Sequence, residues 1–129
     1  MKTMRTFSLC AFALVTALFL TAAPGCFFGP GPESCPGGGC ELHCGQRNRC
    51  NLSCNGGDCR LHCDDSNNCQ TTCNGGDCHV FCDSANHCTS HCSGGDCKVE
   101  CQYANTCDSL CTGGDCDFDC DHANKCSRH

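Results

Sequence analysis

The cysteines of this chain recur with a fixed period of 19 residues. From residue 35 to residue 129 the sequence divides into five blocks without insertions, and each block contains four cysteines. Such a period is typical of a solenoid, in which each unit stacks on its neighbours. Cysteine supplies 22 of the 129 residues and tryptophan none, a composition typical of disulfide scaffolds from oxidising compartments. We therefore expect an exported protein whose fold depends on disulfides.

Each block is predicted to contain two half-coils, each made of one turn and one short strand. Strand alternation places one central side chain of each strand on the inner face, together with the flanking sulfurs. The predicted inward residues are Leu42, Leu61, Val80, Val99 and Phe118 in the first strand, and Leu52, Thr71, Ser90, Ser109 and Arg128 in the second. The pattern predicts an all-β fold, a small disulfide-stapled repeat β-solenoid of five 19-residue coils with parallel sheets. An antiparallel stack of β-hairpins is the alternative, because Asn-Gly-Gly-Asp also suits a hairpin turn.

Cysteines flank every turn, and this arrangement predicts ten disulfides, each across one turn. The predicted pairs are Cys35–Cys40, Cys44–Cys50, Cys54–Cys59, Cys63–Cys69, Cys73–Cys78, Cys82–Cys88, Cys92–Cys97, Cys101–Cys107, Cys111–Cys116 and Cys120–Cys126. Spacing leaves other connectivities open. On the loop-entropy model each short bridge stabilises the fold by about 2 kcal/mol.

The turns carry their own repeated residues. Two adjacent glycines follow the first cysteine of each block, and we expect them to supply the positive φ angles of a tight reversal. An asparagine recurs in the second turn, at positions 48, 67, 86, 105 and 124. Because asparagine tolerates the left-handed region, we expect a left-handed backbone there as well.

Residues 1–25 are typical of a secretory signal peptide. Lys2 and Arg5 precede an uncharged, largely apolar run from residue 7 to residue 23, and small residues end the run. We therefore expect residues 1–25 to be removed on export, leaving residues 26–34 as a flexible Gly/Pro linker before the repeats at 35–129.

Small residues stand directly before Cys26, in the order Ala23, Pro24, Gly25. In this segment the chain resembles a bacterial lipoprotein precursor, in which the cysteine that follows the cleavage site is acylated. Cys26 is also the odd cysteine of the exported chain, since the five blocks take the other twenty in sets of four. We therefore expect lipidation of Cys26, and a free or intermolecular thiol at this position is the alternative.

Residues with catalytic chemistry form no recognisable motif. The seven histidines are scattered over different repeat positions, so the sequence predicts no histidine ladder and no nucleophile–base pair. The paired two-residue cysteine spacing of structural zinc sites is also missing. We expect a protein that is not an enzyme.

One aspartate recurs in the first turn of four successive blocks, as Asp58, Asp77, Asp96 and Asp115. Stacked coils would bring these carboxylates together along one edge, where Ca²⁺ ligated by carboxylates and turn carbonyls could offset their repulsion. In its length and its Gly-Gly and Asp content, the half-coil resembles the calcium-binding RTX repeats. The alternative is that each aspartate accepts hydrogen bonds from nearby backbone amides.

The repeats are acidic. Residues 26–129 contain six lysines and arginines against fourteen aspartates and glutamates, a net charge of −8, so nucleic acid is a poor partner. We expect a non-enzymatic lipoprotein of the bacterial cell envelope, on its outer surface or periplasmic face, with a membrane as one partner and an unknown protein or glycan as another. A Ca²⁺-binding solenoid and a freely secreted extracellular effector or inhibitor are the alternatives.

Overall fold

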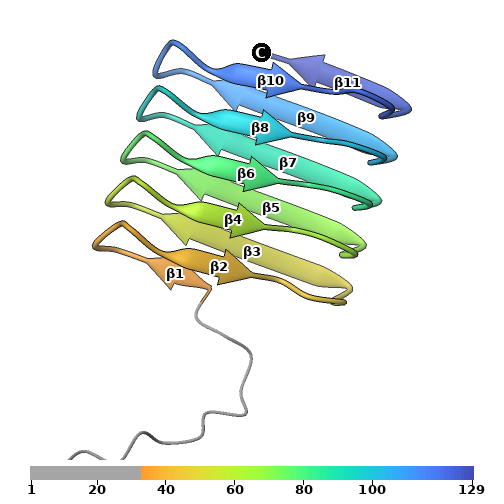
Figure 1. Ribbon diagram of the computed structural model, residues 1–129, viewed down its shortest axis with the longest axis horizontal. Coiled ribbons are helices and arrows are strands. Elements are labelled where there is room, and N and C mark those ends of the chain that lie inside the picture. Colours follow the sequence, from red (N-terminus) through yellow and green to blue (C-terminus); the bar gives the residue numbers. More distant parts are fainter. Residues whose placement is uncertain (1–32) are drawn as a thin grey trace, which may run out of the picture.

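A computed structural model describes residues 33–129, which wind into a flattened β-solenoid (Figure 1). The predicted signal peptide 1–25, Cys26 and most of the predicted linker 26–34 lie outside the described residues. Between residues 33 and 129 there is no helix long and apolar enough to cross a membrane.

Two parallel sheets form the two flat sides of the solenoid (Figure 1). Sheet A contains, in spatial order, β1 (Ser34–Cys35), β3 (Arg49–Cys54), β5 (Asn68–Cys73), β7 (His87–Cys92), β9 (Thr106–Cys111) and β11 (Lys125–Arg128). Sheet B contains β2 (Glu41–His43), β4 (Arg60–His62), β6 (His79–Phe81), β8 (Lys98–Glu100) and β10 (Asp117–Asp119). Each coil therefore contributes one long and one short strand.

Every paired residue lies beside its equivalent 19 positions further along the chain. Cys50 pairs with Cys69 in sheet A, and Leu61 pairs with Val80 in sheet B. All strand pairs between residues 33 and 129 are parallel, which confirms the predicted solenoid and is incompatible with a stack of antiparallel hairpins.

The core is a thin layer of sulfur and small apolar side chains between the sheets. The predicted inward ladder of sheet B is buried from Leu42 to Val99, and Phe118 is half-buried because no further coil covers it. Arg128, the last residue of the predicted inward series in sheet A, is exposed, because the open end of the solenoid lets its long side chain reach solvent. A third column of small buried residues, which the strand pattern did not predict, lies in the second turn and includes Ser66 and Ala85.

The two glycines of the first turn have different roles. The second has a positive φ, 82° at Gly76, as expected. The first has no positive φ, and its hydrogen faces the neighbouring coil: a Cβ on Gly75 would lie 2.1 Å from the backbone nitrogen of Gly57. The first glycine is therefore required by the close approach of adjacent coils, and the prediction of two positive φ angles was wrong for it.

The asparagines of the second turn form a side-chain ladder. From the second coil on, each amide nitrogen donates to the amide oxygen of the asparagine in the preceding coil, for example from Asn86 to Asn67 at 2.9 Å and from Asn67 to Asn48 at 2.8 Å. None of the five has a positive φ, so the predicted left-handed backbone was wrong at these positions. The left-handed residue of this turn lies two positions earlier, as at Asp65 and Ser84.

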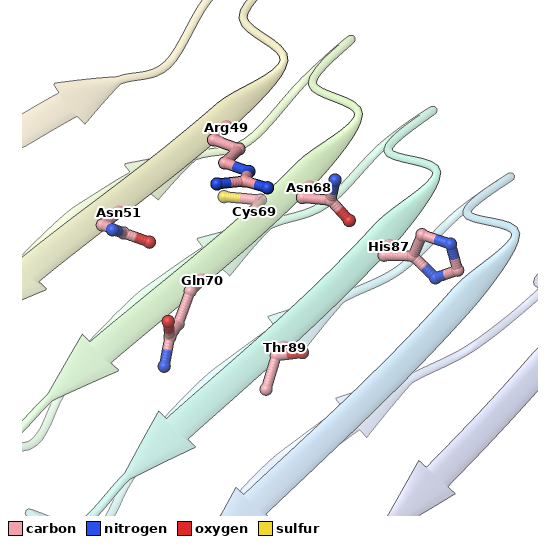
Figure 2. A pocket seen from close by; sticks show the side chains of 7 residues that line it. All are labelled: Arg49, Asn51, Asn68, Cys69, Gln70, His87 and Thr89. Atoms are coloured by element: carbon pink, nitrogen blue, oxygen red, sulfur yellow. The ribbon is translucent and has the colours of Figure 1, made fainter.

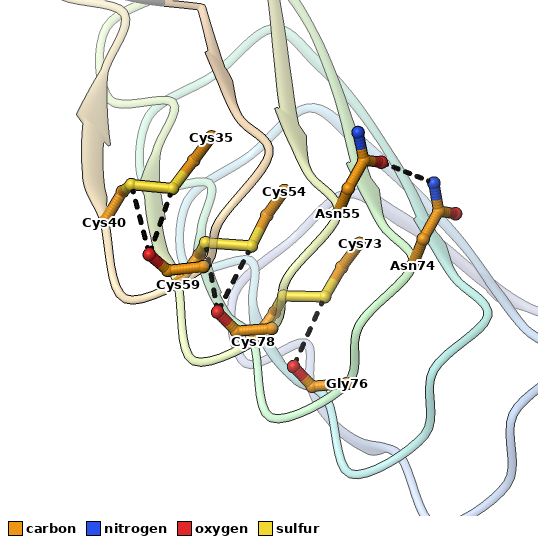
Figure 3. Close-up of a disulfide and its surroundings, with 11 residues drawn as sticks. Cys35, Cys40, Cys54, Asn55, Cys59, Cys73, Asn74, Gly76 and Cys78 are labelled. Carbon is orange, nitrogen blue, oxygen red and sulfur yellow. Dashed lines mark hydrogen bonds between the residues drawn. A yellow bond between two sulfur atoms is a disulfide. The ribbon is translucent and has the colours of Figure 1, made fainter.

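Nine of the ten predicted disulfides are present, each across its own turn. Figure 3 shows bridges of three successive coils stacked above one another, with sulfur close to the carbonyl oxygen of the second glycine, 3.6 Å between Cys73 and Gly76. Bridges cross both turns of every coil except the fourth, while backbone hydrogen bonds join one coil to the next.

The predicted Cys92–Cys97 bridge is absent, and both residues are buried free thiols. The turn between them matches the bonded turns, since φ is 82° at Gly95 and 48° at Asp96. Cys92 instead makes polar contacts with Ser90, at 3.7 Å, and with the Cys97 thiol. The contact between the thiols lowers the pKa of Cys92 and raises that of Cys97.

We predict that Gly75→Ala destabilises the solenoid strongly, whereas Gly37→Ala does not. The added methyl group of Gly75→Ala overlaps the backbone of the preceding coil and should cost about 3 kcal/mol or more. At the equivalent position of the first coil, a Cβ on Gly37 meets nothing within 4 Å, so we expect a change within about 0.5 kcal/mol. Denaturant unfolding without reductant measures both. Equal effects of the two substitutions would contradict the stacking.

We also predict that alkylation in denaturant without reductant labels Cys92 and Cys97 and no other repeat cysteine. A mild oxidant applied to the folded protein beforehand should remove both labels, because the turn geometry already suits a bridge. Peptide mass mapping measures the labels. A label at another repeat cysteine, or none at Cys92 and Cys97 without oxidant, would contradict the structure.

Candidate functional site

The four recurring aspartates lie at exposed turn positions in the left-handed region. Their φ angles run from 43° at Asp115 to 53° at Asp58, and the first coil has Gly39 there, with a φ of 68°. Asp and Gly are both residues that tolerate this backbone. Backbone geometry is therefore one reason for the recurrence of an aspartate at this position.

Neither predicted role of these carboxylates is visible within residues 33–129. No group of three or more potential metal ligands includes one of them. Within this range, backbone amides donate to the carboxylates of Asp119 and Asp83 but not to those of the recurring aspartates. The expected local hydrogen bonds are therefore not formed by Asp58, Asp77, Asp96 or Asp115.

The outward face of sheet A is a flat polar surface. Arg49 and Asn51 on β3, Asn68 and Gln70 on β5, and His87 and Thr89 on β7 line a shallow depression of about 430 Å³ (Figure 2). A second depression of about 370 Å³ continues the surface over β5, β7 and β9, from Gln70 to Leu110. Amides, hydroxyls and imidazoles along three strands offer donors and acceptors to a polar ligand.

Charge is unevenly divided between the two sheets. The outward positions of β3, β5, β7 and β9 include one carboxylate, Asp108. Sheet B carries more, and there Lys98 Nζ and His79 Nε2 lie 2.6 Å and 2.9 Å from Glu100 Oε1. The hydrogen bond from Lys98, with help from His79, lowers the pKa of Glu100.

Two of the histidines are stacked, contrary to the prediction of a scattered set. His43 and His62 hold the same position in successive coils, and their rings lie 4.4 Å apart and nearly parallel. Phe81, in the next coil, stacks on the other side of His62 at 4.5 Å. Alignment of the five blocks at a spacing of 19 is the signal that would have found this stack.

Two carboxylates of the second turn each have one buried oxygen. Asp64 Oδ1 and Asp83 Oδ1 have no hydrogen-bond partner in the described structure. Burial, followed by repulsion from Asp64, raises the pKa of Asp83 above its ordinary value. The carboxylates with an unpartnered buried oxygen therefore lie at the second turn, opposite the turn for which the sequence predicted calcium.

Taken together, the fold and its surfaces define a disulfide-stapled β-solenoid suited to a structural or binding role. The chain matches no protein-family model, and no curated protein or solved structure is significantly similar to it.

The backbone role of the turn aspartates predicts the effect of replacing them. Asp77→Asn with Asp96→Asn should leave the melting temperature unchanged, because asparagine also tolerates a positive φ, whereas the double change to alanine should cost about 1 kcal/mol per residue. Melting curves in calcium and in a chelator measure both variants and the unchanged protein. A rise in melting temperature with calcium that the asparagine variant lacks would instead establish the predicted calcium site.

Proposed function

We propose that this protein is a non-enzymatic module of the bacterial cell envelope that is tethered by an acylated Cys26 and binds a polar glycan along sheet A. The observation that carries the proposal is the uncovered polar face of sheet A, with two adjoining shallow depressions over four parallel strands. A solenoid repeats its side-chain positions at every coil, and a repeating surface suits a repeating ligand.

The chemistry of the face favours a glycan over a protein. Protein interfaces depend on aromatic and arginine anchors that fill pockets. The two depressions are lined by Arg49 but by no aromatic residue other than histidine. Hydroxyls, amides and imidazoles such as Thr89, Gln70 and His87 match the alternating donors and acceptors of a sugar.

Export is supported by the covalent chemistry of the repeats. Nine disulfides within 97 described residues need an oxidising compartment to form and persist. The short Gly- and Pro-containing stretch from Cys26 to Ser34 would hold the first coil close to the membrane. The nine bridges across the turns would keep the binding face rigid, which lowers the entropy lost on binding.

The tether and the face are tested separately. Cys26→Ser should move the protein from the membrane fraction to the soluble fraction and remove the lipid mass from the mature chain. A soluble unchanged protein would point to free secretion.

For the face, the purified repeats are applied to a glycan array together with two arginine variants. Arg49→Ala on sheet A should weaken glycan binding about three- to tenfold through loss of one hydrogen-bonding group. Arg60→Ala, which removes an exposed arginine from sheet B, is the matched control and should leave binding unchanged. Equal loss in both variants, or binding to a protein and to no glycan, would contradict the proposed ligand.

A further inference from the structure

We propose that Glu41, His43 and His62 form a binding site for a divalent transition metal, with Zn²⁺ as the preferred ion. The site lies on the outward face of sheet B, where β2 and β4 of the first two coils run side by side (Figure 1). It is separate from the turn aspartates and from the face of sheet A.

The three potential ligand atoms already lie at metal-site separations. Glu41 Oε1 is 3.1 Å from His62 Nε2 and 3.4 Å from His43 Nε2, and the three atoms all lie within 4.8 Å of one another. Ligands bonded to Zn²⁺ at 2.0–2.1 Å in a tetrahedron are about 3.3 Å apart. Two imidazoles and one carboxylate are also a ligand set that zinc uses in sites with an open fourth position.

His62 has an unsatisfied nitrogen at this place. Its Nε2 is buried and has no hydrogen-bond partner, since the 3.1 Å contact with Glu41 lacks hydrogen-bond geometry. A buried polar atom without a partner is rare and calls for a ligand or another explanation. A metal ion beside Glu41 Oε1 would satisfy Nε2 through its lone pair.

Contacts around His62 restrict the orientation of its ring. Phe81 stacks on one face of the ring and fixes its plane. His43, whose side chain is 60% exposed, stacks nearly parallel on the other face and would turn out of this stack on binding, because two parallel rings cannot both direct an in-plane nitrogen lone pair at one ion. On the far edge of the ring, Asp64 Oδ2 lies 3.7 Å from Nδ1. Carboxylates behind a ligating histidine commonly accept its second N–H and leave the other nitrogen free to bind the metal.

The site is accessible and remains open on one side. The side chains of His43 and Glu41 are 60% and 54% exposed, and that of His62 is 19% exposed. An ion could therefore enter from solvent and keep a water molecule as a fourth ligand. The otherwise similar pair of His79 and Glu100 offers no such site, because Lys98 Nζ already occupies the carboxylate at 2.6 Å.

Metal binding would also stabilise the terminal strand of sheet B. In sheet B, β2 is the terminal strand and pairs with β4 alone. An ion held by Glu41 and His43 on β2 and by His62 on β4 would link the first coil to the second, which no disulfide between residues 33 and 129 does. We therefore expect zinc to raise the melting temperature of the folded protein by mass action.

Titration calorimetry with ZnCl₂ tests the site in the mature, oxidised protein without an affinity tag. Cys92→Ser with Cys97→Ser serves as the background, so that the free thiols cannot bind the metal. We expect one Zn²⁺ per chain, a zinc-dependent rise in melting temperature, and no competition from excess Ca²⁺, because imidazole nitrogen favours transition metals.

Variants assign the ligands. His62→Gln and Glu41→Gln should each abolish stoichiometric binding and the thermal shift, while Asp64→Asn, which removes a positioning residue, should weaken binding about tenfold or more. His87→Gln, on the opposite sheet, is the matched control and should bind as the background does. Circular dichroism confirms that each variant is folded.

The spectrum of bound Co²⁺ provides a second readout that is independent of stability. Visible absorption typical of tetrahedral Co²⁺ with nitrogen and oxygen ligands should appear in the background protein and disappear in His62→Gln. Zinc binding that survives in His62→Gln, or is lost equally in His87→Gln, would overturn the proposal, as would the absence of stoichiometric binding in the background protein.

Discussion

Parallel pairing of each residue with its equivalent 19 positions away is the constraint on which this structure depends. Equivalent residues of successive coils lie beside one another. An interaction that is favourable at one repeat position therefore recurs from coil to coil, as in the amide ladder that includes Asn67 and Asn86. An unfavourable choice is repeated as well, which explains why no side chain is tolerated at the first glycine of the inner turns, such as Gly75. The 19-residue period of the sequence and the regular stacking of the coils therefore depend on each other.

The fold was predictable because its signals are periodic. Cysteine spacing indicated the coils and the bridges across single turns, and alternation indicated the inward position of Leu61 and its equivalents. What the sequence could not show was the contact between coils. The recurring asparagine suggested a backbone angle, whereas its role is a hydrogen bond to another coil. The recurring aspartate occupies a left-handed backbone position, a requirement that its spacing alone did not indicate. The stack of His43 on His62 became visible only when equivalent positions were compared between coils.

The two sheets give the molecule two chemically different sides. Sheet A presents amides, hydroxyls and few charges, while sheet B carries ion pairs such as Lys98–Glu100 and the stacked rings around His62. Since a thin core separates the sheets, neither side has a deep cavity in the described residues, and any ligand must bind at the surface. Affinity would then depend on several surface contacts that are repeated from coil to coil. Each added coil would add contacts and so increase the total binding free energy.

The disulfides within residues 33–129 each join cysteines of a single turn, and none links one coil to another. Duplication or deletion of one 19-residue segment in the gene would therefore leave no cysteine without its partner. Oxidative folding would face no new mispairing problem of long range, because every correct partner remains five or six residues away. The number of coils can consequently change during evolution one whole coil at a time. Such a change would lengthen or shorten the outward faces of the sheets without altering the residues that each coil presents.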